Sequence, residues 1–155
     1  MSKKTIYLII GIVFLISLGI YGIIKFAIAF APGSYPYAEI YTLNYPENKV
    51  QEIIKVIKVK NKNLLPTDST LIDDSIRNNH WIRNYYNLND RTILTWTRPK
   101  SDNETNLAFV GISDSLTHSN WKDINRDLKK EENKRLKIEF ETIILEKIKT
   151  ELEKK

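Results

Sequence analysis

Hydrophobic positions divide the chain into one long apolar segment and several shorter amphipathic ones. Residues 6–24 carry no charge, and thirteen of these nineteen residues are Ile, Leu, Val or Phe. As an α-helix the segment extends about 28 Å at 1.5 Å per residue, close to the roughly 30 Å hydrocarbon core of a bilayer. We therefore expect residues 1–31 to form a cytoplasmic tip and a transmembrane anchor, with residues 6–31 in contact with lipid. The anchor residues include Ile6, Phe14, Ile24 and Lys25.

The charges that flank the apolar segment predict its orientation. Lys3 and Lys4 precede it, and Lys25 is the only basic residue within about fifteen residues after it. The positive-inside rule then places the N-terminus in the cytoplasm and residues 32–155 in the periplasm or outside the cell. A cleaved signal peptide is the alternative, because Ala29-Phe30-Ala31 fits the small-x-small cleavage pattern. The apolar run exceeds the usual length of about 7–15 residues, which favours the uncleaved anchor.

The first half of the remaining chain predicts a strand followed by a helix. Within residues 34–46, side chains alternate from Ala38 to Leu43 in the period of two that is typical of a strand. Pro46 begins the next element at a first-turn position. Apolar residues then recur at i, i+3, i+4 and i+7, which predicts an amphipathic helix; they are Val50, Ile53, Ile54 and Ile57. Residues 61–80 have loop composition, with one helical turn predicted at 71–77.

A β-hairpin is the strongest signal in the chain. Residues 81–88 and 91–98 are rich in aromatic and β-branched types, and Asn89-Asp90 between them tolerates the positive φ angles of a two-residue hairpin turn. A turn is predicted at Pro99–Glu104. Residues 105–113 are apolar on both faces in their middle, which is typical of a central strand.

The C-terminal third predicts a helix. Asn120 and Asp123 fit a capping box, and an apolar stripe begins at Trp121, Ile124 and Leu128. The stripe resumes from Leu136 to Leu152, and we expect 129–135 between them to be a solvated turn. The predicted fold is therefore α+β: a transmembrane helix, then a small antiparallel sheet of about four strands in the order β-α-β-β-β-α, packed by two helices on one face.

Composition excludes several classes of function. The net charge of +5 belongs largely to the anchor, because residues 32–155 carry 21 Lys and Arg against 19 Asp and Glu; this balance argues against a nucleic-acid partner. The chain has no cysteine, so disulfides and thiolate sites are excluded. Gly33 and Gly111 are the only glycines outside the apolar segment, too few for a phosphate-binding loop. We expect no cofactor, no nucleotide and no metal.

Loop carboxylates supply an enzymatic alternative. Asp73, Asp74 and Glu104 are candidates for the paired acids of a small envelope hydrolase or glycan-acting enzyme, which need two carboxyl groups about 5–9.5 Å apart. His80 and His118, with Asp114, Asp73 or Asp74, have the residue types of a two-histidine, one-carboxylate metal site, but nothing in their spacing brings them together. Asp and Ser in loops more often serve turns and caps, as expected at residues 113–115.

The hairpin carries the candidate binding surface. A two-residue turn makes paired residue numbers sum to 179, and the strand period of two then places six side chains on one face. They are Trp81, Arg83, Tyr85, Leu94, Trp96 and Arg98. Aromatic and arginine residues are the usual anchors of partner surfaces. Tryptophans in a strand more often belong to a core, with arginines at its edge, and the sequence leaves both interpretations open.

Together these features predict a membrane-tethered, non-enzymatic module of the bacterial envelope that binds a protein or peptide partner. Richness in Ile, Lys and Asn favours a bacterial source. An immunity-type protein or an envelope-complex subunit is a concrete form of this hypothesis. The oligomeric state does not follow from the sequence.

Overall fold

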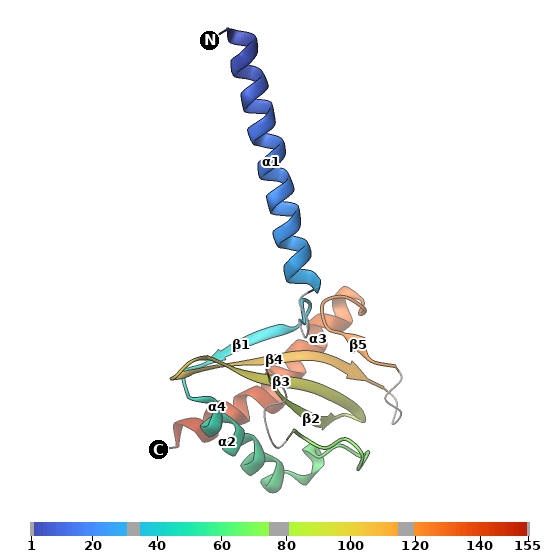
Figure 1. Ribbon diagram of the computed structural model, residues 1–155. Helices are drawn as coiled ribbons and strands as arrows, with labels where there is room; N and C mark the ends of the chain where they lie inside the picture. Colours follow the sequence, from blue (N-terminus) through green and yellow to red (C-terminus); the bar gives the residue numbers. More distant parts are fainter. Residues whose placement is uncertain (1, 31–34, 75–80, 115–119, 155) are drawn as a thin grey trace. The chain divides into compact units, whose positions relative to one another are not determined.

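The chain divides into two compact units, Met1–Pro36 and Tyr37–Lys155. The computed structural model describes residues 2–30, 35–74, 81–114 and 120–154 (Figure 1). The predicted boundary between residues 31 and 32, and the cleavage site that the alternative places there, lie outside the described residues.

The first unit contains one helix, α1, from Lys3 to Phe30. Its segment Lys3–Phe26 has a mean hydropathy of 2.5, and none of the apolar window is buried. The Ser17 hydroxyl donates to the Val13 carbonyl at 2.9 Å, so the polar group inside the apolar stretch is satisfied within the helix. Length and composition are those of a single membrane span, and an N-terminal signal sequence has the same properties.

The second unit is built on an antiparallel sheet of five strands. The strands are β1 (Glu39–Leu43), β2 (Ile82–Leu88), β3 (Arg91–Ser101), β4 (Glu104–Ser113) and β5 (Lys122–Asp123). Their order is β1-β4-β3-β2, and β5 also pairs with β4 (Figure 1). The α+β class with a small antiparallel sheet is confirmed, and so is the central place of residues 105–113. The short strand β5 was not predicted.

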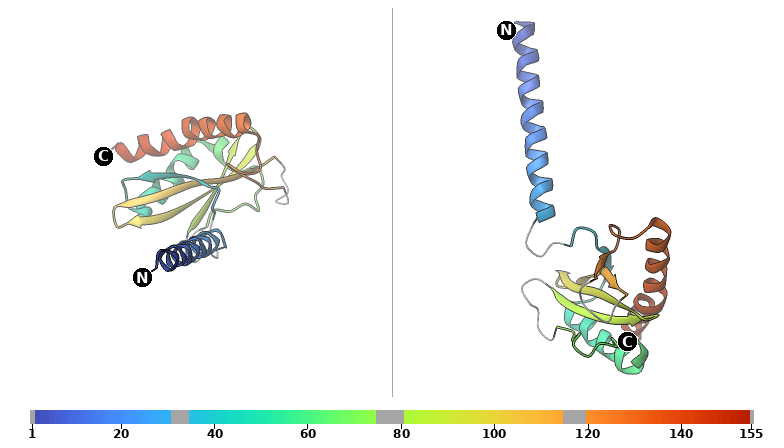
Figure 2. Two further views of the ribbon diagram at one scale, coloured as in Figure 1. Left: turned by 90° about the horizontal axis from the view of Figure 1, so that it is seen from above. Right: turned by 90° about the vertical axis from the view of Figure 1, so that its right-hand side faces the viewer.

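Two helical segments pack on one face of this sheet (Figures 1 and 2). Helix α2 runs from Glu47 to Lys60, and the single turn η1 from Lys62 to Leu64. The C-terminal segment consists of α3 (Lys130–Phe140), the π-helical η2 (Glu141–Leu145) and α4 (Glu146–Glu153). The core between sheet and helices includes the fully buried Ile54, Tyr86, Ile93, Phe109, Phe140 and Ile148.

The C-terminal helix begins later than its apolar spacing predicts. Residues 122–123 pair with β4, and the Ile124 amide donates to the Val110 carbonyl at 3.0 Å, so the sheet uses this backbone. Asn125 then adopts a φ of 64°, which ends any regular helix. The helical spacing of Trp121, Ile124 and Leu128 is therefore coincidental. Conversely, residues 130–135 lie within α3, because Lys, Glu and Arg are strong helix formers.

The π-helical turn follows from the spacing of the apolar stripe. Leu136, Phe140, Ile144, Ile148 and Leu152 recur every four residues, and each is at most 1% exposed. An α-helix advances about 100° per residue, so each interval of four residues turns the stripe by about 40°. The four intervals from Leu136 to Leu152 would therefore turn a stripe on a regular α-helix by about 160° away from the sheet. A turn with i→i+5 hydrogen bonds uses more residues per turn and reduces this rotation. The widened turn keeps all five side chains in the core.

Two connections between elements differ from those that the sequence predicts. Strand β3 continues through Pro99 to Ser101, and Asp102-Asn103 alone connects it to β4. A register irregularity between Pro99 and Ser101 accommodates the proline, which has no N–H for the ladder. The helical turn predicted at 71–77 is not helical over its described part, 71–74.

Gly111 permits β5 to lie against β4. A Cβ at this position would stand 2.5 Å from the Lys122 carbonyl oxygen, a backbone atom that cannot move aside without opening the β4–β5 pair. We predict that Gly111→Ala lowers the free energy of unfolding by about 1–3 kcal/mol, as overpacking does. Urea unfolding of the full chain in detergent micelles, followed by tryptophan fluorescence, measures this. Thr42→Ala on the exposed side of β1 is the control, and an equal effect of both substitutions would contradict the prediction.

Candidate functional site

The hairpin has the predicted register. Asn89 and Asp90 adopt φ angles of 50° and 62°, the two positive values of a type I′ turn. Arg83 lies opposite Trp96, and Tyr85 lies opposite Leu94, as the sum of 179 requires. The turn is also attached to the C-terminal helix, because the Asn89 side-chain amide donates to the Glu139 carboxylate at 3.2 Å.

The six predicted residues lie on the face of the sheet opposite the helices, which we call the outer face. The alternate residues of the same strands, such as Tyr86, Ile93 and Thr95, are fully buried under the helices. The other strands extend the outer face in rows. One row runs Ile40, Ala108, Trp96, Arg83, and the next includes Thr42, Asn106 and Arg98.

The outer face has a buried centre and an exposed rim. Trp96 is only 6% exposed, and Trp81 stacks on it with ring centroids 5.2 Å apart. Ile40, in the same row as Trp96, is 53% exposed, and Arg98 is also exposed. Tyr85 contacts Trp121 at a centroid distance of 6.3 Å. The two interpretations of the sequence therefore each describe part of the surface, since Trp96 belongs to the interior and Arg98 to the rim.

Arg83 is held by an acid from the preceding loop. Its guanidinium donates to both Asp74 carboxylate oxygens, at 3.0 and 3.2 Å. The Arg83 amide also donates to Asp74, and the Asp74 amide donates to the Arg83 carbonyl, each at 3.0 Å. Because β2 is the last strand of the sheet, Asp74 occupies hydrogen-bonding positions that a further strand would otherwise take.

A buried lysine extends this attachment to α2. The Lys58 ammonium, on a side chain only 6% exposed, lies 2.5 Å from the Asp73 carboxylate and donates to the Tyr85 carbonyl at 2.7 Å. Asp73 in turn accepts from the Tyr85 amide at 2.8 Å. Burial lowers the pKa of Lys58, and the charge of Asp73 acts in the opposite direction. We call Lys58, Asp73, Asp74 and Arg83 the edge clamp, since together they satisfy the outward backbone groups of Arg83 and Tyr85.

The carboxylates of the enzymatic alternative do not converge. Asp73 and Asp74 both belong to the edge clamp, whereas Glu104 lies at the β3–β4 turn and pairs with Lys100 at 3.4 Å. Ala108 lies in the same row across the sheet as Arg83. Glu104 precedes Ala108 by four residues, so it lies about 13 Å from that row along β4. That exceeds the separation of paired glycosidase acids.

Metal ligands do not gather in the described parts of the chain. Among those residues no group of three or more His, Asp or Glu side chains is placed to hold an ion. His80, His118 and Ser115 lie outside the described residues. Asp114 contacts Lys122 and Arg91, each at 3.1 Å.

The sequence did not identify three residues that belong to the outer face or to the edge clamp. Trp121 was assigned to a helix, although its ring lies on the outer face. Ile40 was placed in a strand, but its neighbours across the sheet were unknown. Lys58 was assigned to the polar side of α2, although it continues the i+4 series of Val50 and Ile54, and this spacing is the signal that could have identified it as buried.

Removing the carboxylate that pairs with the buried Lys58 tests the edge clamp. We predict that Asp73→Asn lowers the free energy of unfolding by about 3 kcal/mol, because it leaves the Lys58 charge buried without its counterion. Adding Lys58→Met should recover most of this loss, since the double variant carries no buried charge. Urea unfolding in micelles measures both variants. Asp102→Asn at the β3–β4 turn is the matched control, and a double variant less stable than Asp73→Asn alone would contradict the prediction.

Comparison with known proteins identifies no relative of this chain. No protein-family model, no curated protein and no solved structure matches it significantly.

Proposed function

We propose that the chain is a membrane-tethered, non-enzymatic module that binds a protein or peptide partner on the outside of the cytoplasmic membrane. Helix α1 anchors it without being cleaved, and residues 32–155 lie in the periplasm or outside the cell. The partner contacts the outer face of the sheet. An immunity-type protein and a subunit of an envelope complex both fit this description.

One observation carries the proposal: among the described residues, helices cover one face of the sheet only, while the opposite face exposes its rim. Ile40 and Arg98 form exposed parts of that rim, next to the stacked Trp81 and Trp96. An apolar and aromatic centre with a polar, charged rim is the usual composition of a partner surface. The edge clamp fixes β2, so the surface is preorganised and little ordering cost remains for binding.

The N-terminal segment supports the proposed location outside the cytoplasmic membrane. Its nineteen uncharged residues are long enough to span the hydrocarbon core, and two lysines precede them. A cysteine-free chain allows this topology to be tested with single cysteines.

The topology test uses Ser2→Cys and Ser101→Cys, both at exposed positions. We predict that a membrane-impermeant maleimide added to intact cells labels the Ser101→Cys chain and labels Ser2→Cys only after the cells are lysed. The labelled chain should also retain its full-length mass. Labelling of the Ser2→Cys chain alone in intact cells would overturn the location, and a mature chain that starts at Pro32 would overturn the anchor.

The partner test removes the exposed rim without disturbing the buried centre. We predict that Ile40→Ser combined with Arg98→Ser abolishes crosslinking to the native partner in intact cells, because both side chains contribute contact surface. The matched control is Val59→Ser with Lys55→Ser, which replaces an exposed apolar residue and an exposed cation on α2. Retained crosslinking in the rim variant, or equal loss in the control, would contradict the proposal.

A further inference from the structure

The chain enters its second unit through a hydrogen-bonded cluster at one edge of the sheet. Tyr37 is the first residue of the unit, and its carbonyl accepts from the Asn125 side-chain amide at 3.0 Å. The same amide donates to Glu39 at 3.0 Å. Asn125 and Asn133 are joined by two further hydrogen bonds, of 3.0 and 2.7 Å. The first residues of the unit are thus attached to the turn after β5 and to helix α3.

Basic residues surround this point of attachment. The Arg126 guanidinium lies over the Tyr37 ring at 4.9 Å and pairs with Asp123 and Asp127. Four further cations, Lys129, Lys130, Lys134 and Arg135, are exposed and form no ion pair with any residue that the structure describes. Residues 123–135 contain five basic and four acidic residues, a net charge of +1. Because Asp123 and Asp127 pair with Arg126, Glu131 and Glu132 are the acids that stand among the four exposed cations. We call Tyr37, Arg126, Lys129, Lys130, Lys134 and Arg135 the tether end.

The length of the connection limits how far Tyr37 can lie from the end of α1. Six residues, 31–36, separate the last residue of α1 from Tyr37. Even fully extended, this stretch of chain covers at most about 24 Å. The tether end contains one tyrosine, two arginines and three lysines, residue types that concentrate at membrane–water interfaces.

We propose that the tether end contacts anionic phospholipid headgroups and thereby orients the second unit on the membrane. The inference rests on the membrane anchor of the proposed function but not on the identity of the protein partner. Each lysine or arginine near an anionic surface adds to the attraction, and the attraction decays within a Debye length, about 8 Å at physiological salt. The connection is short enough to let the tether end come within this distance of the bilayer surface.

This orientation has a consequence for the outer face. Strands β1 and β5 lie at the edge of the sheet that adjoins the tether end, and β2 forms the opposite edge. Three interstrand spacings separate β1 from β2, about 14 Å. With the tether end on the headgroups, Arg83 on β2 and Trp81 just before that strand are directed away from the lipid and are accessible to a partner.

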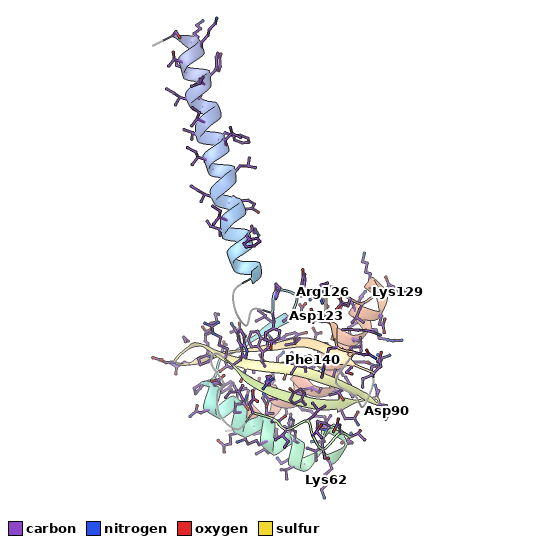
Figure 3. All side chains as sticks on the ribbon, turned by 45° about the vertical axis from the view of Figure 1, so that its right-hand side comes forward. Lys62, Asp90, Asp123, Arg126, Lys129 and Phe140 are labelled. Carbon is purple, nitrogen blue, oxygen red and sulfur yellow. The ribbon has the colours of Figure 1, made fainter. Side chains whose placement is uncertain are left out.

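The experiment measures proximity to lipid at two positions of the full chain in vesicles. Lys129→Cys reports on the tether end, and Lys62→Cys reports on the opposite side of the unit (Figure 3). Each carries a fluorophore that a lipid with a spin-labelled headgroup quenches. In phosphatidylcholine vesicles that contain roughly one third phosphatidylglycerol, we expect quenching at position 129 to exceed that at position 62 by at least about twofold. Pure phosphatidylcholine, or salt at about 0.5 M, should remove most of the difference.

Reversing the charge of two lysines of the tether end distinguishes an electrostatic contact with lipid from closeness that the connection to α1 alone imposes. Lys130→Glu with Lys134→Glu should reduce quenching at position 129 to the level seen in pure phosphatidylcholine. Lys55→Glu with Lys147→Glu makes the same change of charge at exposed positions elsewhere and should leave the quenching unchanged. Equal quenching at positions 129 and 62, or no effect of the first pair, would overturn the inference while the anchor stands. Release of the wild-type chain from the vesicles by alkaline carbonate would overturn the anchor and the inference together.

Discussion

The turn at Asn89-Asp90 determines which side chains of the central hairpin face the helices and which face outward. Because both residues adopt positive φ, the turn has two residues and the strands pair with one register. A shift by one residue would turn over one strand relative to the other and bring either Trp96 or Arg83 under the helices. The buried Tyr86 and Ile93, the stacked Trp81 and Trp96, and the exposed Arg98 all follow from this register. The core and the candidate surface are therefore two results of the same constraint.

The two edges of the sheet are closed in different ways. At one edge, β4 is covered by two segments far apart in the sequence, β1 along residues 105–109 and β5 along residues 111–112. Their junction is where the chain enters the unit, and the hydrogen bonds of Asn125 hold it together. At the other edge, the carboxylates of Asp73 and Asp74 and the ammonium of Lys58 satisfy backbone groups of β2. Charged side chains at an edge strand also discourage pairing with another chain.

The two edges of the sheet also differ in what lies beside them. The first edge adjoins the connection to α1 and the exposed cations of residues 129–135. The second carries the edge clamp and the aromatic part of the outer face. The strands between the two edges are joined by backbone hydrogen bonds and packed on a core that includes Phe109 and Phe140, whose rings lie 4.8 Å apart.

The sequence alone determined the elements whose signal is local. The uncharged stretch of residues 6–24, the apolar period of α2 and the hairpin turn each depend on neighbouring residues, and so does the assignment of the six hairpin residues to one face. The tertiary structure decided what depends on contacts distant in sequence. Residues 121–128 fit a helical period, but pairing with β4 against Gly111 makes them a strand and a turn. The buried Lys58 pairs with the partly exposed Asp73, and Trp121 contacts Tyr85, only because folding brings together segments that no periodicity connects.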